Sequence, residues 1–108
     1  MALQNPDIFQ AIADGTRRDM LMLLSKEKHS INSLAGNFDI SRPAISKHVK
    51  VLAEVGLIVI TDQGRERYCE LNQQGFDEFR EWLAYYDQFW KSKLQKLEKL
   101  LNKKAKHK

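Results

Sequence analysis

Four short helical segments fill the first half of the chain. Apolar residues recur every three or four positions in residues 6–13, 16–24, 30–38 and 41–55. This is the spacing of the buried face of an amphipathic helix. Polar or glycine-containing turns separate the segments, so we expect four helices joined by short connections.

Each predicted helix begins with a residue that can cap its free backbone N–H groups. Asn5, with Pro6 at the first helical position, opens the first helix, and Thr16 is the expected cap of the second. Ser30 and Ser41 have side chains that cap the third and fourth helices in the same way. These capping residues predict where each of the four helices begins.

Beyond the fourth helix the periodicity changes to that of a β-hairpin. Gly56 is a natural helix stop, and a β-branched run follows at residues 57–61. A glycine turn at 63–66 then leads into a second strand at 67–71. The order of helix, short turn, helix and hairpin is typical of a winged helix-turn-helix. The predicted fold is therefore mainly α with a small β-hairpin.

From Asn72 the helical spacing returns and continues to a lysine-rich end. The apolar positions there step by three or four residues: Phe76, Phe79, Leu83, Tyr86, Trp90, Leu94, Leu97 and Leu101. We expect residues 1–72 to form the winged helix-turn-helix domain. Residues 73–108 are expected to form a long C-terminal helix with a lysine-rich tail.

Charge is distributed unevenly along the 108 residues, whose net charge is +4. Residues 91–108 hold eight lysines and one glutamate, so the rest of the chain is net negative. Inside that negative part, residues 41–50 hold three basic side chains and no acidic one. Such a local basic surface is the electrostatic signature of phosphate contact.

The predicted fourth helix has two different faces. Ile45, Val49 and Leu52 have the spacing of its buried stripe. Its outward side is polar or basic and consists of Ser41, Arg42, Ala44, Ser46, Lys47 and Lys50. The second helix of a helix-turn-helix lies in the major groove of DNA. We therefore predict a recognition helix at 41–55, a wing at 57–71 and double-stranded DNA as the partner.

Several linked motifs resemble the ArsR (SmtB/ArsR) family of winged-helix transcriptional repressors. They are FQAIADGTRR at residues 9–18, SRPAISKHVKVL at 41–52, GLI at 56–58 and GRERY at 64–68. The resemblance covers about residues 5–72. It implies a sequence-specific transcriptional regulator, a repressor in most of the family.

The resemblance also assigns roles to individual residues. Base-edge contact falls to three residues of the recognition helix: Arg42, Ser46 and Lys47. Phosphate contact falls to three others on that helix: Ser41, His48 and Lys50. The wing, which reaches the flanking minor groove or backbone, contributes Gly64, Arg65 and Arg67.

A homodimer joined through the first and last helices is a further implication of the resemblance. It would hold two recognition helices about 34 Å apart, as a palindromic operator requires. The expected dimerisation residues are apolar: Ile8, Phe9, Phe79, Leu83, Tyr86 and Trp90. Aromatic side chains bury large areas and anchor interfaces, which favours a dimer core. An apolar effector pocket or a docking surface for a protein effector is the alternative.

The sequence departs from the metal-sensing members of the family. Residues 31–36, where a thiolate site would fall, contain no Cys or His. The last helix offers carboxylates but no histidine before His107, and carboxylates alone make a poor zinc site. We therefore expect no metal and no cofactor, and the sequence resembles the autorepressor branch of the family.

The single cysteine, Cys69, and the absence of a secretory signal or an apolar span predict a cytoplasmic protein, associated with the nucleoid when bound to DNA. Cys69 is interpreted as a small hydrophobic residue, with thiol sensing as the alternative. Of Arg17 and Arg18, one is expected to pair with an acid such as Asp14 or Asp19 and the other to reach phosphate.

Two other classes of function would require different residues. A protein-docking winged helix would favour an acidic or apolar recognition surface, whereas residues 41–50 are basic and polar. An enzyme would need a nucleophile–base pair, a phosphate loop or a metal cluster, and the sequence presents none of these motifs. The prediction is a DNA-binding regulator without catalytic activity.

Overall fold

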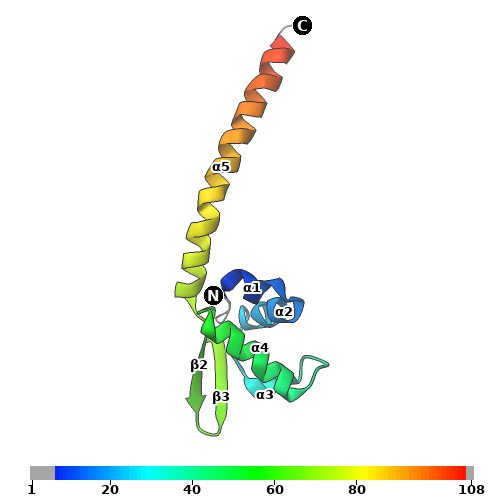
Figure 1. Cartoon of the computed structure of the whole chain (residues 1–108), viewed down its shortest axis with the longest axis vertical. Coiled ribbons are helices and arrows are strands. Elements are labelled where there is room, and N and C mark those ends of the chain that lie inside the picture. The colour runs from blue at the N-terminus through cyan, green and yellow to red at the C-terminus, as the bar shows by residue number, and fades with distance from the viewer. Residues whose placement is uncertain (1–6, 107–108) are drawn as a thin grey trace, which may run out of the picture. The chain divides into compact units, whose positions relative to one another are not determined.

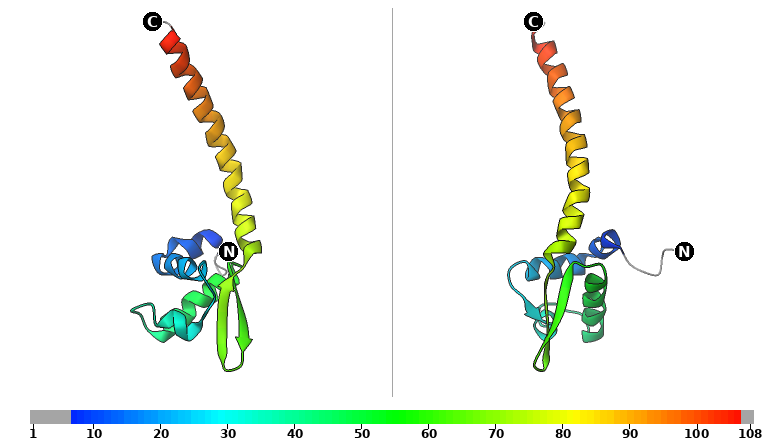
Figure 2. Two further views of the ribbon diagram at one scale, coloured as in Figure 1. Left: turned by 180° about the vertical axis from the view of Figure 1, so that it is seen from behind. Right: turned by 90° about the vertical axis from the view of Figure 1, so that its left-hand side faces the viewer.

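The computed structural model describes residues 7–106, which are arranged in two units (Figures 1 and 2). The first unit ends at Phe76 and the second begins at Asp77. The helices of the first unit are α1 (Ile8–Ala13), α2 (Gly15–Leu24), α3 (Ile31–Ala35) and α4 (Arg42–Glu54).

Side-chain caps begin all four helices, although two of the predicted caps were wrong. Ser30 and Ser41 accept hydrogen bonds from the backbone N–H three residues further on, as predicted. Asp7 caps α1 in a reciprocal capping box with Gln10, whereas Asn5 lies outside the described residues. Asp14, and not Thr16, caps α2, because its carboxylate accepts from the backbone N–H of Arg17.

The sheet has three antiparallel strands, one more than the predicted hairpin. Strands β2 (Ile58–Gln63) and β3 (Glu66–Leu71) form the hairpin, and β1 (His29–Ser30) pairs with the other edge of β3. A strand of two residues is too short to show an alternating pattern, so β1 leaves no signal in the sequence. The fold class is a winged helix-turn-helix, as predicted.

Glycine is required at both turns that frame the wing. Gly56 follows the end of α4 with φ +83° and Gly64 opens the hairpin turn with φ +66°, both in the left-handed region. Gln63 pairs with Glu66 across that turn, so only Gly64 and Arg65 connect the strands. The wing is therefore a tight two-residue hairpin.

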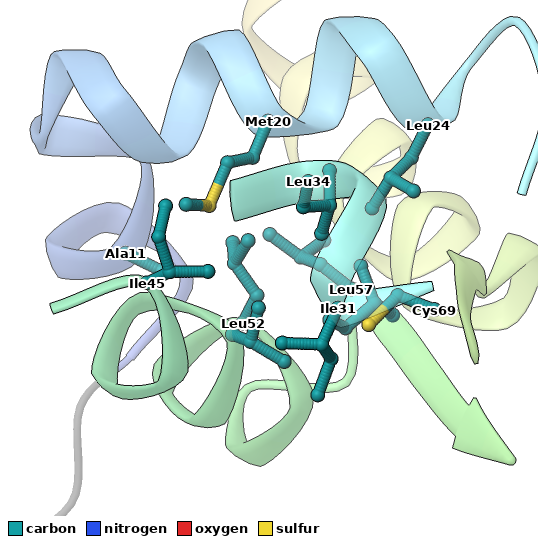
Figure 3. Packing of buried hydrophobic residues seen from close by; sticks show 11 residues of the cluster. Ala11, Met20, Leu24, Ile31, Leu34, Ile45, Leu52, Leu57 and Cys69 are labelled. Atoms are coloured by element: carbon teal, nitrogen blue, oxygen red, sulfur yellow. The ribbon is translucent and has the colours of Figure 1, made fainter. Parts of the chain in front are cut away.

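The core of the first unit lies between the helices and the sheet (Figure 3). The predicted inward residues of α4 are buried, with Ile45 and Leu52 fully inaccessible. They pack with side chains from every neighbouring element, and the cluster consists of Ala11, Met20, Leu24, Ile31, Leu34, Ile45, Val49, Leu52, Leu57, Ile58 and Cys69. This core holds α4 with its polar side outward.

Helix α5 (Gln73–Lys106) begins against the link between α4 and β2. The side-chain amide of Asn72 donates to the carbonyl of Gly56 at 2.9 Å, and the backbone N–H of Asn72 donates to Leu57 O at the same distance. A Cβ on Gly75 would stand 2.0 Å from Gly56 O. Only glycine allows this approach of the two backbones.

The second unit is the continuation of α5. Its large apolar side chains are exposed within this chain, and they are Trp82, Leu83, Tyr85, Tyr86, Phe89, Trp90, Leu94, Leu97, Leu100 and Leu101. Neighbouring aromatic rings contact one another along the helix, as between Trp82 and Tyr86, whose centroids lie 4.7 Å apart. Nowhere in residues 7–106 is there a helix both long and apolar enough to cross a membrane.

Candidate nucleic-acid interface

The outward side of α4 forms the candidate DNA-binding face. Ser41, Arg42, Ser46, Lys47 and Lys50 are exposed. Ala44 and His48 are half-buried, at the boundary between this face and the core. The sequence therefore predicts correctly which side of α4 is open to solvent.

Helices α3 and α4 are linked directly at this face. The Arg42 guanidinium donates from Nη1 to the side-chain oxygen of Asn32 on α3. Ser41 Oγ accepts from the backbone N–H of Ala44 and so orders the first turn of α4. These bonds fix the N-terminal end of α4, which is the end that approaches base edges in helix-turn-helix proteins.

Two of the basic residues carry acidic neighbours. Lys50 lies 4.0 Å from Glu54, one turn further along α4. Arg67 on β3 lies 3.2 Å from Asp62, its register partner on β2. All four side chains are well exposed, and exposed ion pairs contribute little free energy, so both cations can exchange their partners for phosphates.

A shallow groove separates α4 from the wing. Its volume is about 550 Å³. Charged side chains from both sides line it, Lys50 and Glu54 from α4 and Arg67 from β3, together with Ser46 and the apolar Ile60. Residues far apart in the sequence thus meet in one groove within the first unit.

His48 lies beside two residues at the start of α2, Arg17 and the N-cap Asp14. The Nη1 of Arg17 lies 3.1 Å from His48 Nδ1, and Asp14 Oδ2 lies 4.0 Å from the same nitrogen. The backbone N–H of Arg17, which donates to Asp14, lowers the pKa of that carboxyl, and the positive charge of the Arg17 guanidinium lowers it further. Sequence reasoning missed this cluster, because nothing in a local pattern joins α2 to α4.

Arg17 and Arg18 both stabilise the C-terminal end of α1. Arg17 donates from Nε to Ala11 O at 2.7 Å and from Nη2 to Gln10 O at 3.1 Å. Arg18 donates from Nη1 to Ile12 O and Ala13 O. The acid pair expected for one arginine is replaced by these carbonyls, because the helix leaves its last carbonyls unpaired.

Cys69 is a core residue. Its side chain is fully inaccessible in the middle of β3, and burial raises the pKa of its thiol. The thiolate is the reactive form of cysteine, so both effects lower its reactivity. The packing interpretation therefore accounts for Cys69 better than thiol sensing does.

No group of three His, Cys, Asp or Glu residues that could hold a metal ion occurs within residues 7–106. The first unit presents the exposed basic residues of α4 beside the wing. A capped helix of this kind, presented by a helix-turn-helix beside a hairpin, defines a winged-helix DNA-binding domain.

Comparisons with known proteins identify the family. Residues 14–59 match the family described as "Bacterial regulatory protein, arsR family". The chain is 36% identical over 88 residues to the HTH-type transcriptional regulator Rv2034 of Mycobacterium tuberculosis, which covers 81% of this chain and 79% of that protein. It is 32% identical over 80 residues to the transcriptional repressor SdpR of Bacillus subtilis, covering 74% and 89% of the two chains. The chain belongs to the ArsR family and is a DNA-binding transcriptional regulator.

Solved structures agree with this assignment. The crystal structure of the ArsR family transcriptional regulator RHA00566 is similar, with a TM-score of 0.72, 39% identity and coverage of 79% of this chain and 88% of that one. The same fold occurs in Mb0332 from Mycobacterium bovis, whose winged helix-turn-helix domain is described as homodimeric (TM-score 0.60, 20% identity, coverage 73% and 74%).

Proposed function

We propose that the protein is a homodimeric transcriptional repressor that binds a palindromic operator in the cytoplasm and has no catalytic activity. One observation carries the proposal: residues 41–50, which begin α4, present three exposed basic residues and no acidic one, while the first 90 residues of the chain are otherwise rich in acid. DNA is the partner that such a face fits. The relative named as a transcriptional repressor supports repression.

Within that face, we assign base reading to the N-terminal half of α4. Arg42, Ser46 and Lys47 are exposed there and offer the donors that guanine and adenine edges accept. The proposed phosphate contacts are Ser41, His48 and Lys50. Ala44 would pack against the major groove of the DNA. The wing would follow the flanking backbone through Gly64, Arg65 and Arg67, which are all exposed.

We propose that a second copy of the chain covers the exposed apolar side chains. Phe9 on α1 and Leu83, Tyr86 and Trp90 on α5 are each at least 40% exposed, and Ile8 and Phe79 complete the set. Leaving so many large apolar groups in water is unfavourable, and a twofold pair would bury them. Residues 73–108 are thus the proposed dimerisation element, and the action of a protein or small-molecule effector stays a prediction.

Fluorescence anisotropy tests this function. A labelled duplex from upstream of the protein's own gene is titrated in the presence of unlabelled random DNA, with added zinc and with a chelator in parallel. We expect tight binding of two protomers per palindrome that resists the competitor and ignores zinc. Equal affinity for random DNA would contradict sequence-specific repression, and loss of binding in chelator would contradict a metal-independent repressor.

A further inference from the structure

The hydrogen bond between Arg17 and His48 determines which nitrogen of the imidazole carries a proton. A guanidinium group only donates hydrogen bonds and has no acceptor. Because Arg17 Nη1 lies 3.1 Å from His48 Nδ1, that nitrogen must accept and so carries no proton. A neutral imidazole then holds its single proton on Nε2.

The surrounding groups keep the guanidinium in this position. Its Nε and Nη2 donate to two α1 carbonyls, those of Ala11 and Gln10, at 2.7 and 3.1 Å. Three separate acceptors on two elements therefore hold one planar group. Such a group loses little freedom for each bond it makes.

The competing arrangement would need a proton on Nδ1 and an acceptor for it. The only acid recorded near that nitrogen within residues 7–106 is Asp14, at 4.0 Å, which is beyond hydrogen-bond distance. The same carboxylate oxygen already accepts from the backbone N–H of Arg17 at 3.0 Å. Geometry therefore favours the neutral ring.

We propose that Arg17 is a positioning residue that holds His48 as the neutral tautomer protonated on Nε2, so that α4 offers an uncharged N–H donor to a DNA phosphate. The inference rests on the proposed function for the DNA contact, and on the structure of the free protein for the tautomer. The His48 side chain is 18% exposed, so its ring is partly open to solvent while Nδ1 is occupied.

An uncharged hydrogen-bond donor and a charged one differ in how the DNA affinity depends on salt concentration. Each lysine or arginine that neutralises a phosphate releases counterions and adds about 0.9 to the slope of log K against log salt concentration. A neutral N–H releases none. His48 and Lys50, two phosphate contacts on one helix, should therefore contribute to affinity in different ways.

The first test is performed on the full-length protein without DNA. A two-bond ¹H–¹⁵N correlation spectrum near neutral pH reports which imidazole nitrogen is protonated, and the His48 signals are assigned by their loss in His48→Gln. We expect a protonated Nε2 and a bare Nδ1. Arg17→Lys should shift the signals towards a mixture of tautomers. Arg18→Lys, which alters an arginine that also binds α1 but not His48, should leave them unchanged.

The second test measures operator binding as a function of salt. His48→Ala should weaken binding about 10-fold at every salt concentration, the scale of one hydrogen bond to a charged group, with the slope unchanged. His48→Gln, which keeps a neutral N–H donor, should recover most of that loss. Lys50→Gln should lower the slope by about 0.9.

The outcomes separate the inference from the function on which it rests. A proton on Nδ1 in the free protein, or a slope that falls in His48→Ala as it does in Lys50→Gln, would overturn the inference. Unchanged affinity in His48→Ala would overturn the DNA contact. If the wild-type protein binds no operator, the proposed function fails while the spectrum still decides the tautomer.

Discussion

Asp14 shows how much one side chain can contribute to this fold. It ends α1, caps α2 and lies beside His48. The backbone N–H of Arg17 holds the pKa of the Asp14 carboxyl below the usual value. Stability from this group is present above the pKa of an unfolded aspartate and is lost as the pH falls through the lower folded pKa.

We expect Asp14→Ala to lower the free energy of unfolding by about 1 kcal/mol at neutral pH, which is the usual contribution of a helix cap. The loss should shrink in acid, where the wild-type carboxyl is protonated. Urea unfolding at several pH values measures both effects. Thr16→Ala is the matched control and should be nearly neutral, since Thr16 does not cap α2. Equal losses in the two variants would mean that Asp14 does not act through its cap.

Lys47 carries the clearest prediction for base reading. It is exposed on α4, and within the described part of the chain its amine has no recorded ion pair or hydrogen bond to give up on binding DNA. Lys47→Ala should reduce the affinity ratio of operator to random DNA by about 10-fold, the scale of one lost base contact.

Anisotropy titrations against both DNAs give that ratio. Lys26→Ala is the control, because it removes the same charge from the exposed turn after α2. If Lys47→Ala weakens operator and random DNA equally, Lys47 contacts phosphate and not bases.

At the scale of elements, the start of α5 depends on a glycine inside a helix. Alanine normally stabilises a helix relative to glycine by about 1 kcal/mol. At Gly75 the sign should reverse, because a new Cβ would stand 2.0 Å from Gly56 O and 2.7 Å from Gly56 C. We expect Gly75→Ala to lower the free energy of unfolding by about 1–3 kcal/mol, the usual cost of overpacking.

Urea unfolding of Gly36→Ala supplies the comparison. A Cβ on Gly36 would meet its nearest heavy atom at 3.5 Å, which is ordinary contact, so this variant should be nearly neutral. Similar stability for both variants would show that α5 can move away from Gly56 without cost.

The three-stranded sheet has a consequence at the same scale. Strand β1 directly precedes α3 and pairs with β3 of the wing. The helix-turn-helix and the wing are therefore joined through β3 as well as through α4. This pairing connects the two elements that are proposed to contact DNA.

At the scale of the whole molecule, the proposed homodimer depends on the exposed apolar residues of α5. Trp90→Glu places a charge among the side chains proposed to pack against a second copy, so it should dissociate the dimer. Loss of the second linked binding site should then weaken operator binding by about 100-fold or more. Sedimentation equilibrium and anisotropy measure the two effects. Gln88→Glu, two positions earlier and so on the opposite side of the helix, should remain dimeric. A dimeric Trp90→Glu variant would exclude this part of α5 from the interface.

The sequence by itself determined the order of the helices and of the two hairpin strands, the buried stripe of α4 and the basic face on its other side. These features follow from local rules: the period of apolar residues, the capping of helix ends by Ser30 and Ser41, and the left-handed backbone at Gly56 and Gly64. Each rule acts within a few residues and can therefore be read along the chain.

Only the tertiary structure decided which distant groups meet. Strand β1 exists because β3 offers it a free edge, and Gly75 is required because the link after α4 lies against it. Arg17 reaches His48 across 31 positions of sequence, so no local pattern records their contact. Such contacts depend on how the core closes, because burial brings segments together whose separation in the chain carries no signal.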